Sequence, residues 1–171
     1  MPVEQGEVAE LVYPEQTRNY HYEIELVVAI GKAGRCIPLE RAGEHVWGYA
    51  VGLDMTCRDL QMTMREMGRP WEIGKAFDHS APIAPLHKAD AVDCARAAIW
   101  LNVNGEERQR SEIGMLIWSV PEIISHLSQY FELREGDLIM TGTPEGVGPV
   151  AAGDLMEGGI DGLGHIEVRV V

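Results

Sequence analysis

Several features are missing from this 171-residue sequence, and each absence excludes a class of protein. No apolar run approaches the roughly 20 residues that span a bilayer, and no signal-peptide pattern opens the chain. Basic residues are few, because 14 Lys and Arg stand against 27 Asp and Glu and give a net charge of −13. Phosphate binding needs basic patches. We therefore expect neither a membrane nor a nucleic acid as a partner.

Cysteine is also scarce. Cys36, Cys57 and Cys94 are odd in number, lie far apart and form no Cys-x-x-Cys pair, which is typical of a reduced cytosolic protein and not of a disulfide scaffold. The sequence has no Gly-x-Ser-x-Gly motif and no phosphate loop ending in Gly-Lys-Ser/Thr. These patterns predict a cytoplasmic location and argue against serine-hydrolase and P-loop chemistry.

The patterns that are present predict one β-rich domain. The length suits a single domain over residues 1–171. Alternating or buried-looking apolar runs predict strands, and an Asn104-Gly105 pair predicts a hairpin over 99–108. A short helix is expected over 56–67, closed by Gly68, and a second should begin at Ser119 with a capping box. The expected strands cover 22–30, 46–55, 136–141 and 164–171. The sum is an α+β domain with two or three short helices.

Glu23 and Glu25 are the first candidate functional residues. On a strand, residues two apart point to the same face, and the neighbours Ile24 and Leu26 are apolar. Two carboxylates on one face are costly to bury unless solvent or a cation neutralises them. The pair is therefore either a solvated face of a half-buried strand or part of a cation site.

Asp54 is a third acid, and it follows the apolar run YAVGL. An aspartate at this point could instead cap the helix that follows. Three carboxylates without His or Cys make a hard, oxygen-rich site that suits Mg²⁺, Mn²⁺ or Ca²⁺ and is unlike a zinc site. The three acids together favour a divalent-cation site.

Three further residues and one loop could act on a substrate. Lys75 stands between a glycine and an apolar pair, and near a cation its ammonium form would be disfavoured; it could equally be a surface lysine. Arg58 and Gln61 are three residues apart and share one helix face, which could bind a carboxylate or be simply solvated. The loop 141–148, TGTPEGVG, could cradle an anion or be an ordinary turn.

Taken together, four segments of the sequence resemble the fumarylacetoacetate hydrolase family. They occur in the family's order and span nearly the whole chain: HYEIELV at 21–27, YAVGLDMTCRDLQ at 49–61, GRPW at 68–71 with Lys75, and TGTPEGVG at 141–148. Each motif is weak to moderate alone, whereas four in the right order are highly specific.

The resemblance implies a mixed β-roll or sandwich fold of the family's C-terminal type, a homodimer, and one Mg²⁺ or Mn²⁺ per subunit. It also implies a role for each candidate residue: metal ligands at Glu23, Glu25 and Asp54, a catalytic lysine at Lys75, and substrate contacts at Arg58, Gln61 and Thr143.

The implied reaction is hydrolysis of a C–C bond in a small anionic diketo acid. The chain looks most like bacterial family members that split fumarylpyruvate into fumarate and pyruvate in the gentisate route of aromatic degradation. Lys75 would then stabilise the enolate that departs. Two alternatives stay open: decarboxylation of oxaloacetate or isomerisation of a muconate-type diacid at the same site, and a non-catalytic domain that binds a metal or ligand.

The sequence departs from the family pattern at its N-terminal end. Family members usually carry a further segment with a Gly-x-Asn-Tyr-type motif and a mobile lid whose Glu–His pair activates water. Only 22 residues precede Glu23 here, and we find no equivalent pair among them. The prediction is a single catalytic domain without the lid segment. Three explanations stay open: the sequence is a truncated form, water is activated otherwise, or the chain is not fully active.

Overall fold

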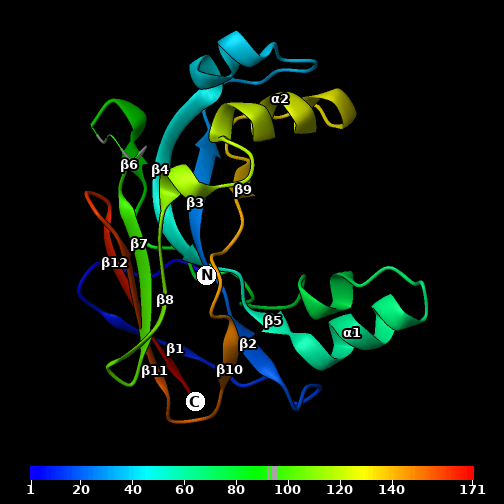
Figure 1. Cartoon of the computed structure of the whole chain (residues 1–171), viewed down its shortest axis with the longest axis vertical. Coiled ribbons are helices and arrows are strands. Elements are labelled where there is room, and N and C mark those ends of the chain that lie inside the picture. The colour runs from blue at the N-terminus through cyan, green and yellow to red at the C-terminus, as the bar shows by residue number, and fades with distance from the viewer. Residues whose placement is uncertain (92, 94–95) are drawn as a thin grey trace.

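The computed structural model describes residues 1–91, 93 and 96–171 (Figure 1). Strands dominate, together with two α-helices and several short 3₁₀ turns, as predicted for a β-rich α+β domain. The strands are β1 Val8–Leu11, β2 Tyr20–Tyr22, β3 Ile24–Ile30, β4 Val46–Leu53, β5 Thr56–Cys57, β6 His87–Lys88, β7 Ala98–Val103, β8 Glu106–Glu112, β9 Leu138–Met140, β10 Gly148–Val150, β11 Leu155–Ile160 and β12 Gly164–Val170; the α-helices are α1 Arg58–Glu66 and α2 Val120–Tyr130.

Within the described part of the chain, the strands form three sheets. Their orders are β1-β12-β11-β7-β8, β10-β2-β5 and β6-β4-β3-β9. The pair β1 and β12 is parallel, whereas the other pairs are antiparallel. In Figure 1 the long strands β3 and β4 run up the middle of the molecule, with α2 over their upper end and α1 at the lower right beside β5. The predicted mixed β architecture is confirmed.

The buried side chains form two clusters that meet along β3. Tyr22, Ile24 and Leu26 belong to the larger one, which fills the space between the sheets. Val28 and Ile30 belong to the smaller one, which lies under α2. These five residues alternate along the chain and therefore share one face of the strand path. Glu23 and Glu25 project from the opposite face, which continues with the buried Val27 and Ala29.

The strand predicted over 22–30 is interrupted at Glu23. Residues before it pair with β5 and β10, and residues after it pair with β4 and β9. The chain passes from one sheet to another at this point. Sequence periodicity cannot predict such a break, because both halves alternate in the same phase. Glu23 thus lies at the junction of two sheets.

Other boundaries agree with the sequence to within a few residues. The helix expected over 56–67 begins later, because Thr56 and Cys57 pair with β2 as β5. Gly68 has a φ of +64°, as expected after a helix C-cap, and Asn104 and Gly105 turn the β7–β8 hairpin with φ of 53° and 78°. The Ser119 backbone N–H donates to the Glu122 carboxylate over 2.7 Å in the predicted capping box at α2.

The structure also shows the state of two cysteines and the character of the helices. Cys36 and Cys57 are free thiols, and Cys94 lies outside the described residues. Neither α-helix nor any other helix in the described ranges has the length and apolar character needed to cross a bilayer.

Candidate active site

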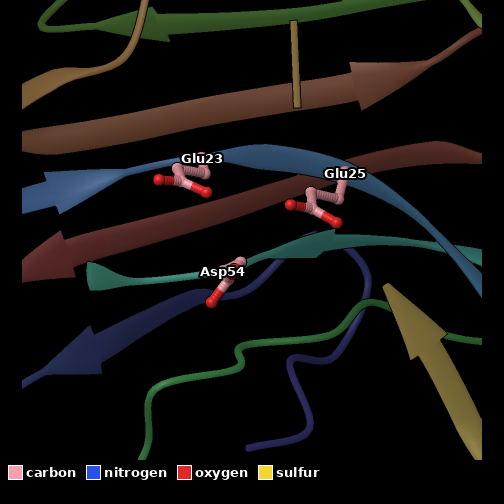
Figure 2. Close-up of side chains that lie close together, drawn as sticks. All are labelled: Glu23, Glu25 and Asp54. Atoms are coloured by element: carbon pink, nitrogen blue, oxygen red, sulfur yellow. The ribbon is translucent and has the colours of Figure 1, made fainter. Parts of the chain in front are cut away.

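Glu23, Glu25 and Asp54 lie together on one face of the β3–β4 pair (Figure 2). Ile24 is opposite Leu53, and the Asp54 N–H donates to the Glu23 carbonyl over 2.8 Å, so Asp54 stands across from Glu23. Directly opposed residues of an antiparallel pair project to the same side. One oxygen atom from each of the three carboxylates lies within 4.8 Å of the other two.

The burial of these acids rules out the alternative of a solvated strand face. Glu23 is 8% exposed and Glu25 is 4% exposed. The alternative role of Asp54 as a helix cap is also wrong. Cys57 occupies the N-cap of α1, and the Asp54 carboxylate instead accepts a hydrogen bond from Lys75. The three acids therefore form a buried carboxylate cluster.

The glycine-rich loop after β9 contacts this cluster through its backbone. The Gly142 N–H donates to Glu25 Oε2 over 2.7 Å. Gly142 has a φ of +103°, a conformation that is strained for residues with a side chain. A glycine here lets the chain turn its amide toward Glu25. The loop therefore contacts the cluster directly.

Lys75 lies between two of the acids. Its ammonium donates to Glu23 Oε2 over 2.8 Å and to Asp54 Oδ2 over 2.5 Å, and its side chain is 19% exposed. The alternative of an ordinary surface lysine is wrong. The two contacts use two of the three ammonium hydrogens, so one remains to donate to a bound molecule.

Arg58 and Gln61 extend the cluster along α1, on the shared helix face that their spacing predicts. Arg58 donates through Nη2 to Glu23 Oε1 and through Nη1 to Gln61 Oε1 over 2.6 Å. These contacts use two of the five guanidinium hydrogens. The remaining hydrogens are available to an anionic ligand. The alternative of a purely solvated helix face is excluded.

Gly74 lets the segment that carries Lys75 approach α1. A Cβ atom at this position would lie 2.8 Å from the Gln61 backbone nitrogen and 2.9 Å from its Cα. Backbone atoms of a helix cannot shift cheaply to make room. Any larger residue would push Lys75 away from the acids.

Burial and crowding of negative charge change the titration of the cluster. Burial raises the pKa of Glu25 from 4.5 to about 7, and the neighbouring carboxylates of Asp54 and Glu23 add to the rise. The Gly142 N–H and Lys75 act in the opposite direction. Burial also raises the pKa of Asp54, against the hydrogen bond from Lys75. Without a cation, Glu25 therefore holds a proton up to near-neutral pH.

This raised pKa predicts how stability depends on pH and metal. Folded, metal-free protein keeps the Glu25 proton up to about pH 7, whereas the unfolded chain loses it near 4.5. The contribution of Glu25 to the free energy of unfolding is therefore present at low pH and is lost as pH rises from 4.5 through 7. A cation needs the ionised carboxylate, so saturating Mn²⁺ should raise the melting temperature more at about pH 8 than at about pH 6.

Glu25→Gln is the matched control for this measurement. Other groups titrate in the same range, among them His21, whose pKa burial lowers. The difference between wild type and Glu25→Gln isolates the Glu25 contribution. A wild-type protein whose metal-free stability rose relative to the variant over this range would contradict the assignment.

Thr143 hydrogen-bonds to a residue outside the predicted site. Its hydroxyl oxygen accepts a hydrogen bond from Gln109 Nε2 over 2.8 Å. Gln109 was not singled out from the sequence, although it is 1% exposed on the otherwise exposed strand β8. No local pattern marks it, because a polar residue in a polar strand predicts a surface position.

A pocket of about 480 Å³ lies beside the loop. Its lining is mostly apolar and includes Ile113, Leu116 and Trp118 together with the loop residues Gly142 and Thr143. Charged ends of a diacid suit the carboxylate cluster with its cations better than this apolar lining. The pocket is therefore a neighbour of the candidate site and not its charged centre.

Comparison with known proteins identifies the family of the chain. A family model described as fumarylacetoacetate (FAA) hydrolase C-terminal matches residues 4–171. The chain belongs to this family. The predicted resemblance is thus confirmed, and the fumarylacetoacetate hydrolase fold accounts for the mixed sheets.

Individual members of the family are similar over most of the chain. A fumarylpyruvate hydrolase from Ralstonia sp. is 48% identical over 98% of this chain and 86% of its own length. The human mitochondrial oxaloacetate tautomerase FAHD1 is 44% identical over 94% of this chain and 73% of its own. The crystal structure of fumarylpyruvate hydrolase from Pseudomonas aeruginosa in complex with Mn²⁺ and pyruvate has a TM-score of 0.98 and 69% identity, over 100% of this chain and 74% of that one.

The carboxylate cluster fits a hard divalent cation. Its three ligand atoms are carboxylate oxygens, the donor type that Mg²⁺, Mn²⁺ and Ca²⁺ prefer. When ionised, the three acids carry one more negative charge than Lys75 and Arg58 neutralise. A buried excess of negative charge is costly unless a further cation is present.

Proposed function

We propose that this protein is a metal-dependent hydrolase that cleaves the C–C bond of an acylpyruvate, with fumarylpyruvate as substrate and fumarate and pyruvate as products. The observation that carries the proposal is the position of Lys75, whose ammonium contacts two of the three clustered carboxylates. A cationic donor is thereby held beside a cation site. The similarity to two fumarylpyruvate hydrolases supports the choice of substrate.

Glu23, Glu25 and Asp54 would hold the cation, either Mg²⁺ or Mn²⁺, with Ca²⁺ as a poorer replacement. The Mn²⁺ in the Pseudomonas aeruginosa structure supports this assignment. When bound, the cation supplies Lewis-acid polarisation of the keto group of the substrate. Gly142 would keep Glu25 oriented through its backbone N–H.

Lys75 would also act on the reacting atoms. Hydrolysis adds the hydroxyl of water to the acyl carbon, and the bond to the neighbouring CH₂ carbon breaks. The electron pair of that bond passes into the pyruvate part as an enolate, and a proton then returns to this carbon to give the methyl group of pyruvate. The third ammonium hydrogen of Lys75 can stabilise the negative charge as it develops, which is where a fixed charge lowers the barrier most.

The substrate carboxylates need cationic or hydroxyl partners. Arg58 is pre-oriented by Glu23 and Gln61, and its remaining guanidinium hydrogens suit a carboxylate. Thr143 would donate its hydroxyl hydrogen to a substrate oxygen from the loop side. Gln61 would complete this part of the site through its amide.

A substrate panel tests the proposal. With Mn²⁺ or Mg²⁺, we expect equimolar pyruvate and fumarate from fumarylpyruvate, and no turnover after removal of the metal with a chelator. Other acylpyruvates should react more slowly. Near-normal activity in the metal-stripped assay would contradict the proposal.

Chemistry on oxaloacetate is a second candidate, which the 44% identity to an oxaloacetate tautomerase favours. Tautomerisation, decarboxylation and isomerisation of a muconate-type diacid also pass through an enolate, so the same residues would serve. The panel should therefore include enol and keto oxaloacetate. Tight binding of oxalate, an enolate mimic, without turnover of any of these compounds would instead indicate a non-catalytic binding protein.

We also propose that the protein is a homodimer, works in the cytoplasm, and binds neither nucleic acid nor membranes. The charge of −13 and the free thiols support the last two statements. Exposed apolar side chains at Met115, Ile117 and Trp118, with Ile117 96% exposed, support self-association. A molar mass near that of one 18.9 kDa chain in light scattering would contradict the dimer.

A further inference from the structure

The side chain of Gln109 joins three parts of the molecule that meet at the candidate site. Its Oε1 accepts from the Ile24 N–H over 3.0 Å, and its Nε2 donates to Thr143 Oγ1 and to the Pro144 carbonyl, both over 2.8 Å. The strand β8 is thus linked to the first residue of β3, which lies between Glu23 and Glu25 in the chain, and to the loop that contacts Glu25.

The contact between Gln109 and Ile24 lies at the end of β3 that β9 does not pair with. β9 pairs with β3 from Val27 to Ala29, and the chain then leaves the strand as the glycine-rich loop. The Ile24 N–H is buried between the two glutamates, and an unpaired buried N–H is costly. Gln109 provides the acceptor that the departing strand no longer supplies, and this fixes the peptide group between Glu23 and Ile24.

The orientation of the Gln109 amide follows from its partners. The Pro144 carbonyl can only accept, and the Ile24 N–H can only donate. A flipped amide would place acceptor against acceptor and donor against donor at these two contacts. Nε2 therefore faces the loop, and Thr143 Oγ1 is the acceptor in its contact with Gln109.

The direction of the hydrogen bond from Gln109 determines how the Thr143 hydroxyl can act. Because Gln109 donates to its oxygen, the hydroxyl hydrogen of Thr143 points elsewhere. Thr143 is partly exposed and directly follows Gly142, whose N–H binds Glu25. The hydroxyl is thus preset as a donor close to the carboxylate cluster, where an anionic ligand would need one.

We propose that Gln109 is a positioning residue for the reaction. It holds Thr143 as a hydrogen-bond donor to a substrate oxygen, and its contacts with Ile24 and Pro144 fix the direction of its amide. This inference rests on the proposed function, because it assigns the substrate as the acceptor for Thr143.

A double-mutant cycle tests the proposal with oxalate as the ligand of the Mn²⁺-loaded protein, measured by calorimetry. Gln109→Met removes the amide at similar volume, and Thr143→Val removes the hydroxyl at similar shape. Each single variant should weaken oxalate binding about tenfold, the effect of one hydrogen bond to a charged group. The double variant should also be weakened only about tenfold, because Gln109 acts through the hydroxyl that Thr143→Val has already removed.

Thr143→Ser is the matched background. It keeps the hydroxyl, so adding Gln109→Met there should again cost about tenfold. If Gln109→Met does not fold, Gln109→Asn replaces it, because the shorter side chain keeps the amide but cannot reach the loop. The KM for fumarylpyruvate should follow the same pattern in all backgrounds.

The outcomes separate this inference from the proposed function. Losses that multiply to about a hundredfold in the double variant would show that Gln109 acts only on general stability, and would overturn the positioning role. In that case wild-type turnover of fumarylpyruvate would leave the proposed function intact. A wild-type protein that binds no oxalate in the presence of Mn²⁺ would overturn both.

Discussion

Replacing Asp54 by asparagine should abolish metal-dependent turnover. The variant keeps the shape of the side chain but removes one of the three charges that lie within 4.8 Å of one another. Changes in groups that only support metal ligands already cost about 10- to 100-fold in metal affinity. We therefore expect Mn²⁺ binding to weaken by more than about a hundredfold, measured by calorimetry, and product formation to fall to the background rate.

Asp161→Asn is the matched control for this experiment. Asp161 is exposed in the turn between β11 and β12, and its substitution makes the same chemical change far from the cluster along the chain. It should leave Mn²⁺ affinity and turnover unchanged. An Asp54→Asn protein that binds Mn²⁺ as tightly as the wild type would remove Asp54 from the metal site.

Replacing Lys75 by methionine should separate metal binding from catalysis. Turnover should fall by about a hundredfold to a thousandfold, the usual effect of losing one donor to a developing negative charge. Affinity for Mn²⁺ should increase, because the ammonium occupies oxygens of Glu23 and Asp54 that a cation would otherwise use. The melting temperature of the metal-free protein should decrease, since the clustered carboxylates lose a neutralising charge.

Two further variants sharpen the interpretation of the lysine experiment. Lys88→Met removes an exposed lysine on β6, and we expect it to change neither the metal affinity nor the rate. Lys75→Arg keeps a positive charge and should preserve most of the metal-free stability without restoring the rate, because its planar group has a different reach. Weaker Mn²⁺ binding by Lys75→Met would show that Lys75 supports the ligands and does not compete with the cation.

Local sequence pattern predicted the parts of the site whose residues are close together in the chain. Glu23 and Glu25 share a face because side chains on a strand alternate, and Arg58 and Gln61 touch because residues three apart on a helix are neighbours. The hairpin at Asn104 and the capping box at Ser119 follow equally from local backbone preferences. Each of these features depends on geometry within a few residues.

Prediction from local pattern failed where one sequence pattern is compatible with two different structures. The alternation over 22–30 continues through Glu23, although the chain changes sheets there. The Thr56–Cys57 pair looked like the first turn of a helix, but it pairs with β2 instead. In both cases a distant partner strand decides the structure, and the local pattern is compatible with either result.

The sequence by itself determined the kind of site: three acids in two strand contexts, a lysine in an unusual setting, and a glycine-rich loop, all with the chemistry of a hard cation. Only the tertiary structure decided that Asp54 stands opposite Glu23, that Lys75 lies between them, and that Gln109 ties their strand to the loop. These contacts join residues separated by 21 to 85 positions. Their geometry depends on strand register and on the packing of whole elements, which no short stretch of chain encodes.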